Sequence, residues 1–378
     1  MLYLNMEPPK KTGLNARILV PVLLLVCVVG FAGYGLYAQT KTEPVEALEV
    51  PTPQETQILP EPPKPLHVAL PEEVRGIYWT ADTARSSRRD ELLSYMLKTG
   101  LNSVVIDIKM DNGQLVFPAT STLENLGQKN IYRIARIAVM RDSAYAMEHP
   151  NSAVKSSGGG LWRDKTGAAW LDPGAPDVAD YAIAVGRQAI ALGFDELQYD
   201  YIRFPSDGVL GAIRYPLSGD KDKAVVMRAM FDKIGALRSE GIPISFDVFG
   251  MTYWSSAHFG IGQRLEDVYP NADFISPMVY PSHYPTGFRG FANPAVHPYE
   301  IVKQTLDKGA EMLEANHFVS STESRIKSRP WLQDFDIGAT YTASLIEAQI
   351  KATRDAGASG WILWNARNVY EPAVYIKH

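Results

Sequence analysis

Two hydrophobic patterns alternate along residues 74–366. Short apolar runs rich in β-branched residues are typical of buried strands, and apolar residues at helical spacing are typical of amphipathic helices. We predict eight strands, at Val74–Ala81, Ser103–Met110, Tyr132–Met140, Glu196–Phe204, Pro243–Met251, Asp273–Pro281, Ser324–Phe335 and Gly360–Ala366. The helices expected between them include Arg88–Lys98, Val178–Leu192, Lys223–Ser239, Pro298–Asn316 and Ala343–Ala356.

Strands that alternate with helices imply parallel βαβ units, and eight such units predict an α/β fold, a (β/α)8 TIM barrel. An open doubly wound sheet is the alternative. It requires a phosphate-binding loop, but neither GxGxxG nor GxxxxGK(S/T) follows any predicted strand. Residues 141–176 follow the third strand and include two tryptophans. We therefore expect an ordered loop there that helps to build a site.

The N-terminal part of the chain has the features of a membrane anchor. Residues 18–38 carry no charge and are long enough to cross a bilayer, which takes about 20 helical residues. Lys10, Lys11 and Arg17 precede them, which predicts a cytoplasmic tail at residues 1–17 and an extracytoplasmic remainder. A cleaved signal peptide is the alternative, although Leu36–Tyr37–Ala38 is a poor cleavage site.

Residues 39–73 are rich in proline and glutamate and predict a semi-rigid linker. The barrel is then expected at residues 74–378, held away from the membrane. The sequence therefore predicts a membrane-anchored protein whose folded domain is extracytoplasmic. It leaves the oligomeric state open.

The composition narrows the classes of function. The net charge of −5 gives no electrostatic footprint for nucleic acid. The single cysteine, Cys27, lies in the apolar N-terminal run, so the predicted barrel has no disulfide and no cysteine nucleophile. HxH, HExxH and GxSxG motifs are absent. We therefore predict no metal or other cofactor and no serine nucleophile elbow.

The fourth predicted strand carries the strongest functional signal. Strand alternation places Gln198, Asp200 and Ile202 on one face and aromatic residues on the other. A carboxylate in an aromatic strand is costly to bury without a partner, and at the C-terminal end of a barrel strand it indicates chemistry. The alternative is a structural aspartate paired with Arg203 or another nearby cation.

The same alternation selects inward-facing candidates on other strands. It places Asp200 and Asp247 at matching depth on adjacent strands, which lie about 4.8 Å apart. Glycosidases hold their two carboxyl groups about 5 Å apart for retention and about 6.5–9.5 Å apart for inversion. The other candidates on this face are Asp107, Lys109, Arg136, Gln198, Tyr280 and Trp364.

Tryptophans occur near several predicted strand ends, where they would suit stacking on the apolar faces of sugar rings. For any single tryptophan, packing in the core or in a loop is an equally good interpretation. Their clustering favours a sugar-binding role for the group, which comprises Trp79, Trp162, Trp170, Trp254 and Trp364.

Residues 193–201 resemble the fourth-strand signature of chitinase-type barrels, GFDGIDLDWE. The run Met278–Val279–Tyr280 and the last-strand Trp364 fit the same plan. However, Ile202 stands where a chitinase has its glutamate acid, and Gln198 where it has its middle aspartate. Substrate-assisted chitin hydrolysis is therefore not expected, and a second carboxylate must come from another strand.

A closer resemblance covers residues 74 to about 370. It is to a bacterial family of TIM-barrel domains described as predicted glycosyl hydrolases, which is distantly similar to polygalactosaminidase-type barrels as well. The resemblance implies this fold and reaction class but no particular sugar. The matching runs are Arg75–Gly76–Ile77–Tyr78, Val105–Ile106–Asp107–Ile108–Lys109, Ile134–Ala135–Arg136–Ile137, Trp170–Leu171–Asp172–Pro173 and residues 200–208.

These observations predict a glycoside hydrolase that acts on a polysaccharide. Asp200 is expected as nucleophile or stabilising carboxylate and Asp247 as general acid/base, its pKa raised by the neighbouring negative charge. A barrel that binds glycan without cleaving it, as a wall-attachment or assembly factor, is the main alternative; a lyase or deacetylase is a weaker one. The residues expected to bind substrate are Tyr78, Trp79, Asp107, Lys109, Arg136, Trp170, Asp172, Gln198, Arg203, Tyr280 and Trp364.

Overall fold

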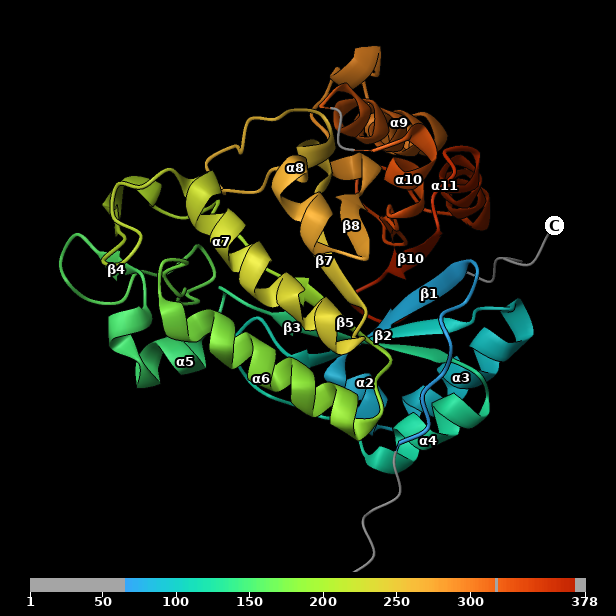
Figure 1. Ribbon diagram of the computed structural model, residues 1–378. Helices are drawn as coiled ribbons and strands as arrows, with labels where there is room; N and C mark the ends of the chain where they lie inside the picture. Colours follow the sequence, from blue (N-terminus) through green and yellow to red (C-terminus); the bar gives the residue numbers. More distant parts are fainter. Residues whose placement is uncertain (1–64, 317–318, 371–378) are drawn as a thin grey trace, which may run out of the picture. The chain divides into compact units, whose positions relative to one another are not determined.

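The computed structural model describes residues 65–316 and 319–370. Within them, eight parallel strands close into a barrel in the order β1-β10-β9-β8-β7-β5-β3-β2 (Figure 1). This confirms the predicted (β/α)8 barrel. The strands are β1 (Val74–Trp79), β2 (Ser103–Lys109), β3 (Tyr132–Ala138), β5 (Glu196–Asp200), β7 (Ile244–Phe249), β8 (Phe274–Val279), β9 (Trp331–Gln333) and β10 (Gly360–Trp364).

Helices connect successive strands and lie around the outside of the barrel (Figure 1). The five helices predicted from the sequence are present with nearly the expected bounds. The α-helices are α2 (Ala81–Arg85), α3 (Arg88–Thr99), α4 (Thr120–Gln128), α5 (Ser143–Glu148), α6 (Pro176–Leu192), α7 (Lys223–Gly235), α8 (Leu265–Val268), α9 (Pro298–Ala315), α10 (Ser321–Ile326) and α11 (Ala343–Asp355).

The seventh predicted strand is wrong over most of its length. Of the expected range, residues 331–333 form β9, whereas residues 321–326 form α10. A capping box explains the helix, because the Ser320 side chain accepts from the Glu323 N–H and the Glu323 carboxylate accepts from the Ser320 N–H. The short strand leaves little room for a period-two pattern.

The fourth strand also ends earlier than predicted. It stops at Asp200 because Tyr201 has a φ of +50°, a left-handed conformation that a strand cannot continue. At its other end, α6 closes on Gly193 with a φ of +109°, so the chain turns directly into β5. Asp200 is therefore the last residue of its strand, at the C-terminal edge of the barrel.

Alternation along the strands divides the buried residues between two regions. One set, exemplified by Ile77, Trp79 and Ile137, belongs to the large cluster shared with the helices. The other set fills the inside of the barrel and includes Tyr78, Ile134 and Trp331. Polar residues of this inner face, Asp107 and Arg136 among them, share the parity of the second set. This parity directs them to the barrel interior.

The barrel closes between β1 and β10, where Val74 pairs with Gly360. Gly360 has a φ of +142°, and a Cβ added there would lie 2.2 Å from the Val74 carbonyl oxygen. Only glycine fits this close approach of two backbones. The seam therefore depends on a single residue type at this position.

The segment before β1 is fastened at the N-terminal ends of the strands. The Val68 N–H donates to Asp195 Oδ1 over 2.8 Å, and the Arg133 guanidinium donates to the Leu66 carbonyl oxygen over 2.6 Å. Arg133 and Asp195 form a buried ion pair of 2.7 Å. These contacts lie at the barrel face opposite the C-terminal strand ends, so the chain enters the domain on the side away from Asp200.

The long segment after β3 is ordered, as predicted. It contains α5 and the short strand β4 (Lys155–Ser156), which pairs antiparallel with β6 (Ile213–Arg214). Both of its tryptophans, Trp162 and Trp170, are buried in the large outer cluster. The segment therefore has a core of its own that continues into that of the barrel.

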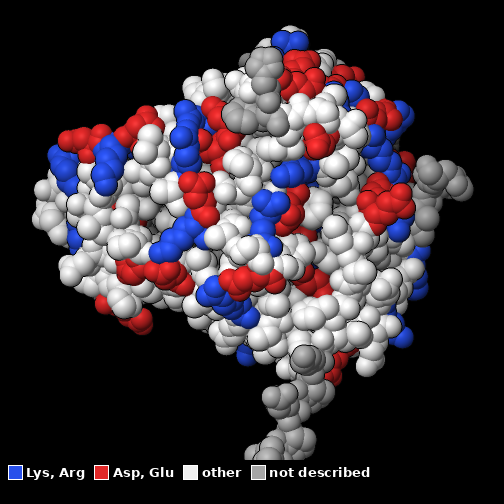
Figure 2. Space-filling view, in the orientation of Figure 1, with Lys and Arg blue, Asp and Glu red and all other residues white. Residues whose placement is uncertain are grey.

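The predicted tail, membrane span and most of the linker lie outside the described residues. Within residues 65–316 and 319–370, no helix is long and apolar enough to cross a membrane. On the face drawn in Figure 2, basic and acidic side chains are intermingled and no large area carries one sign.

Candidate active site

A cavity of about 390 Å³ opens at the C-terminal ends of the barrel strands. This is the face on which TIM-barrel enzymes build their active sites. The cavity combines aromatic walls with a few charged groups. Its lining residues lie on, or shortly after, the strands β3, β5, β7, β8, β9 and β10: Arg136, Asp200, Tyr201, Arg203, Phe249, Gly250, Met251, Met278, Tyr280, His283, Tyr284, Trp331 and Trp364.

Arg136, on β3, is the central cation of the site. Its Nη1 donates to Asp107 Oδ1 over 2.5 Å, and its Nε and Nη2 both donate to Asp200 Oδ2, the first over 3.1 Å. Its Nε also lies 3.8 Å from Asp247 Oδ2. One buried guanidinium therefore binds carboxylates from three strands, and their charges raise its pKa against the effect of burial.

Asp107 is held on its other side by Tyr78, whose hydroxyl donates to Asp107 Oδ2. Burial raises the pKa of the Asp107 carboxyl, although Arg136 and this hydrogen bond act in the opposite direction. Neither Asp107 nor Tyr78 lines the cavity. Asp107 binds the Arg136 guanidinium and Tyr78 binds Asp107, so the two residues together fix the orientation of Arg136.

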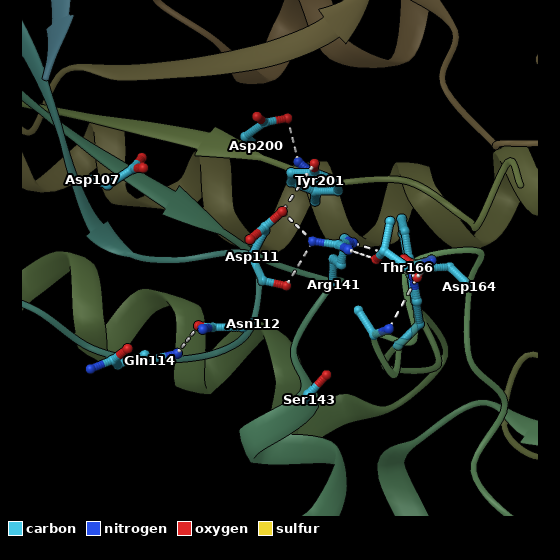
Figure 3. Close-up of polar contacts among 12 residues, drawn as sticks. Asp107, Asp111, Asn112, Gln114, Arg141, Ser143, Asp164, Thr166, Asp200 and Tyr201 are labelled. Atoms are coloured by element: carbon cyan, nitrogen blue, oxygen red, sulfur yellow. Dashed lines mark hydrogen bonds and ion pairs between the residues drawn. The ribbon is translucent and has the colours of Figure 1, made fainter. Parts of the chain in front are cut away.

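Asp200 is the only carboxylate among the cavity-lining residues of the described chain. Its Oδ2 accepts from Arg136, and its Oδ1 accepts the Tyr201 N–H over 2.5 Å (Figure 3). Tyr201 itself has a positive φ. Left-handed backbone at a non-glycine residue is costly and is often found at functional sites.

Asp247, on the neighbouring strand β7, is almost completely enclosed, with 1% of its surface exposed. Trp331 Nε1 donates to its Oδ1 over 2.7 Å, whereas its Oδ2 accepts no hydrogen bond from the described residues. Burial raises the pKa of this carboxyl well above its ordinary value, and the charge of Asp200 adds to the rise. Asp247 is thus favoured in the protonated form, with burial rather than charge as the main cause.

The geometry limits the distance between the two predicted catalytic carboxylates. Strands β5 and β7 are adjacent, and Gln198 pairs with Ser245, so Asp200 and Asp247 follow at matching depth. Arg136 Nε lies 3.1 Å from Asp200 Oδ2 and 3.8 Å from Asp247 Oδ2. These two oxygens are therefore at most about 7 Å apart, a range that includes both retaining and short inverting separations.

Aromatic rings from β1, β9 and β10 surround Arg136. Tyr78 and Trp364 stack with centroids 4.2 Å apart, and Trp331 meets Trp364 edge-on at 5.5 Å. The Arg136 guanidinium lies 5.3 Å from the Trp364 ring. Trp331 and Trp364 both line the cavity, which gives it aromatic surface next to the carboxylates. Such surface is suited to the apolar face of a sugar ring.

Loops from three strands meet beside Tyr201, as Figure 3 shows. Arg141, after β3, donates to Asp164 Oδ2 over 2.8 Å and also to Asp111, which follows β2. The Tyr201 hydroxyl donates to Asp111 Oδ2 over 3.4 Å, and the Arg141 guanidinium lies 5.6 Å from the Tyr201 ring. This network fixes the strained residue that follows Asp200.

Comparison with known families gives a match to the model of DUF4015, described as "Putative glycosyl hydrolase domain", over residues 76–370. The chain belongs to this family. The matched range spans every barrel strand except the start of β1, and it includes all the cavity residues. A comparison with curated proteins gives no match.

Solved structures similar to this glycosyl hydrolase domain include several barrels. A hypothetical protein from Ruminiclostridium thermocellum is 29% identical, over 46% of this chain and 97% of that one, with a TM-score of 0.41. The α-galactosidase of Thermus thermophilus is 14% identical, over 82% and 61%, with a TM-score of 0.48. The glycoside hydrolase domain of PelA from Pseudomonas aeruginosa is 11% identical, over 80% and 96%, with a TM-score of 0.44. At these TM-scores the similarities add nothing to the family assignment.

Of the predicted site residues in this glycosyl hydrolase domain, the structure brings Arg136, Asp200, Arg203, Tyr280 and Trp364 to the cavity. Tyr78, Asp107 and Asp247 contact that group without lining the cavity. Gln198 lies deeper in the barrel, where its Nε2 donates to Ser276 Oγ over 3.0 Å. Asp200 pairs with Arg136 and not with Arg203.

Lys109 does not face the barrel interior, so its predicted place on the inner face beside Asp107 is wrong. Its amine lies 2.6 Å from Asp142 Oδ2. The register between β2 and β3 shifts at this point, so that Asp107 pairs with Arg136 but Lys109 pairs with the next residue, Ile137. This bulge breaks the alternation and turns Lys109 to the outer side.

Three further residues predicted to bind sugar are enclosed elsewhere. Trp79 lies in the outer cluster between barrel and helices, with no exposed surface. Asp172 accepts from the Leu217 and Ser218 N–H groups and so joins two loops. Trp170 is also buried, and its Nε1 donates to Asp164 Oδ2 over 3.0 Å. None of them reaches the cavity.

Two other tryptophans from the predicted stacking group do not line the cavity either. Trp162 is buried and donates to the Val209 carbonyl oxygen, and Trp254 donates to Thr305 Oγ1 over 2.9 Å. Trp331, by contrast, lines the cavity and bonds Asp247, but the sequence interpretation missed it. The signal that could have identified Trp331 was its position in the strand predicted at Ser324–Phe335.

A second ion pair occupies the deeper layer of the barrel. Arg329 binds Glu196 through both terminal nitrogens, and both side chains are fully buried. Ser245 Oγ and the Tyr132 hydroxyl also donate to Glu196, over 2.7 Å and 3.1 Å. Neither Arg329 nor Glu196 lines the cavity, so we assign this network to the structure rather than to the site.

Groups of three or more histidine, cysteine, aspartate or glutamate residues that could hold a metal ion do not occur within the described parts of the chain. The acidic side chains near the cavity are instead each held by Arg136. The groups available for chemistry are therefore two carboxyl groups in different surroundings, a guanidinium and aromatic surface.

Proposed function

We propose that this glycosyl hydrolase family member is a membrane-anchored, extracytoplasmic enzyme that cleaves a polysaccharide by a two-carboxylate mechanism. The observation that carries the mechanism is the shared contact of Asp200 and Asp247 with Arg136 Nε. This contact keeps two carboxyl groups with different surroundings within the separation that glycosidases use.

In the proposed mechanism, Asp200 acts as the ionised carboxylate. It pairs with Arg136, accepts the Tyr201 N–H and lines the cavity. As nucleophile or as a stabilising charge, it would face the anomeric carbon, where positive charge develops in the transition state. The stacked rings of Tyr78 and Trp364 support the sugar-binding wall beside it.

Asp247 acts as the general acid that protonates the leaving oxygen. Its raised pKa keeps a proton on the carboxyl, and the unpartnered Oδ2 leaves that proton free for donation. Asp247 lies directly beneath the cavity wall, because its two partners, Arg136 and Trp331, both line the cavity. Substrate binding must move one of these side chains before the acid can reach the leaving oxygen.

The membrane anchor in this proposal rests on the sequence of residues 1–38, in which basic residues precede an uncharged stretch. Fractionation of cells that produce the full chain tests this part. The protein is expected in the membrane fraction, with residues 65–370 open to protease added outside the cytoplasmic membrane. Recovery in the cytoplasmic fraction would contradict it.

The enzymatic part is tested by release of reducing ends from cell-wall and exopolysaccharide preparations. The wild-type chain is expected to release them, and the double variant Asp200→Asn/Asp247→Asn is expected to release none. Binding of a polysaccharide by the wild type with no product after long incubation would instead support the binding-only function that the sequence left open.

A further inference from the structure

Arg203 is the one charged group of the cavity that the proposed mechanism does not use. It follows β5, lines the cavity and has only 8% of its surface exposed. Its Nη1 donates to the Phe204 carbonyl oxygen and to Ser206 Oγ, both over 3.1 Å. Its Nε and Nη2 make no hydrogen bond with the described residues. One edge of the guanidinium therefore has no partner.

The unused edge is the one that elsewhere in this domain binds carboxylates. Nε and Nη2 lie side by side and form a planar fork that matches the two oxygens of a carboxylate. Arg133 presents this fork to Asp195, Arg354 presents it to Glu73, and Arg136 presents it to Asp200. Arg203 has the same fork and no acid in it.

Buried cations without an acid are otherwise absent from the described chain. Asp200 and Asp207 attract Arg203 at longer range, but no carboxylate oxygen lies within 4.0 Å of it in the described residues. Burying an unpaired charge is costly, so a partner is expected. The other buried cations all have one: Lys109 pairs with Asp142, Arg133 with Asp195, Arg136 with Asp107 and Asp200, and Arg329 with Glu196.

The surroundings hold Arg203 ready for a ligand. Its guanidinium lies 4.7 Å from the Phe249 ring, 5.0 Å from the Trp170 ring and 5.2 Å from the Tyr201 ring. These rings fix the side chain and compensate part of its charge. The Arg203 Nε and Nη2 atoms have no hydrogen-bond partner among the described residues, but they are not fully buried. Solvent therefore reaches the free fork.

We propose that Arg203 binds the carboxylate of an acidic sugar, and that the substrate is a polysaccharide containing uronic acid residues. The inference rests on the proposed function, since it names the substrate class of the same cavity. Asp200 and Arg203 are three positions apart in the chain and line the same cavity, so one sugar or two neighbouring sugars would contact both. Arg203 is then a specificity-determining residue.

The test compares binding of glucuronate and galacturonate oligosaccharides with that of the same oligosaccharides after carboxyl reduction to neutral sugars. The full-length Asp200→Asn/Asp247→Asn chain is used, so that no cleavage interferes. It is expected to bind at least one acidic oligosaccharide about tenfold or more tightly than its neutral counterpart. Arg203→Met is expected to remove that preference, so that it binds the acidic and the neutral oligosaccharide with equal affinity.

Two further variants keep the test decisive if Arg203→Met folds poorly. Arg203→Lys retains the charge but loses the fork and should show a reduced preference. Arg187→Met removes an arginine of α6 that pairs with Glu240 and does not line the cavity, and it should keep the full preference.

Equal binding of acidic and neutral oligosaccharides, or no binding of the acidic ones, would overturn the inference. Preference for the acid without any cleavage by the wild type would leave the inference standing and contradict the proposed hydrolase mechanism. Cleavage of neutral polysaccharide alone would support the hydrolase mechanism and overturn the inference that the substrate contains uronic acid.

Discussion

Trp331 donates its indole N–H to Asp247 Oδ1 over 2.7 Å. This hydrogen bond favours the ionised carboxylate and opposes the rise in the pKa of Asp247 that burial causes. Trp331, which lines the cavity, therefore also limits how far burial raises the pKa of the proposed acid.

Replacing Trp331 with phenylalanine tests this relationship. The variant loses the hydrogen bond, so the pKa of Asp247 should rise further and the alkaline limb of the kcat/KM profile should move to higher pH. Trp254→Phe is the matched control, because its indole bonds Thr305 away from the cavity. A Trp331→Phe profile that moves to lower pH, or a Trp254→Phe profile that moves as much, would contradict the assignment.

Asp247→Asn should abolish cleavage and yet make the domain more stable at neutral pH. The native pKa of Asp247 is raised, so between an ordinary aspartate pKa of about 3.9 and the raised value the native state holds a proton that the unfolded chain has released. Stability therefore falls as the pH rises through this window, and asparagine removes that loss.

Thermal unfolding of wild type and Asp247→Asn at about pH 4 and about pH 8 measures the effect. The gain in Tm should be larger at the higher pH. Asp200→Asn is the contrast, since it removes the ion-pair partner of Arg136 and should lower Tm. An Asp247→Asn variant with a lower Tm at the higher pH would show that the carboxyl is ionised in the native state.

Arg136→Met should destabilise the fold by about 3–5 kcal/mol, because it leaves buried carboxylates without their cation. Glu196→Gln is the comparison, since it breaks the fully buried pair with Arg329 in the deeper layer and should cost a similar amount. Denaturant unfolding measures both. Only Arg136→Met should also abolish cleavage by the folded protein; equal loss of kcat in both variants would argue against a specific role for Arg136.

Gly360→Ala tests the barrel seam. An added Cβ would lie 2.2 Å from the Val74 carbonyl oxygen, and the φ of +142° is strained for any other residue. The expected destabilisation is at least about 1–3 kcal/mol, with a lower midpoint in denaturant unfolding. Gly159→Ala is the control, since its φ is also positive but an added Cβ meets no atom within 4 Å. Equal effects of the two changes would mean that strain, and not the contact across the seam, explains the loss.

The sequence predicted the barrel and the inner position of Asp107, Arg136, Asp200 and Asp247, because strand alternation is strict wherever a strand has no bulge. It failed at Lys109, where one extra residue in β2 reverses the facing direction. It also predicted a raised pKa for Asp247 from charge alone, whereas burial is the larger cause.

Other features depend on contacts that alternation does not encode. The three ion pairs of Arg136 arise only when β2, β3, β5 and β7 are brought together by barrel closure. Asp172 lies in a motif that led to its prediction as a site residue. It instead accepts hydrogen bonds from two loop N–H groups that lie far along the chain, which strand alternation cannot predict. Trp331 was missed because β9 has three residues, too few to show a period.

The central claim is that Asp200 and Asp247 together cleave a glycan. Its most direct test is the rate of reducing-end release by the single variants Asp200→Asn and Asp247→Asn on a polysaccharide that the wild type cleaves. Each is expected to lower kcat by a factor of about 10² or more while glycan binding is retained. Wild-type kcat in either variant would contradict the pairing.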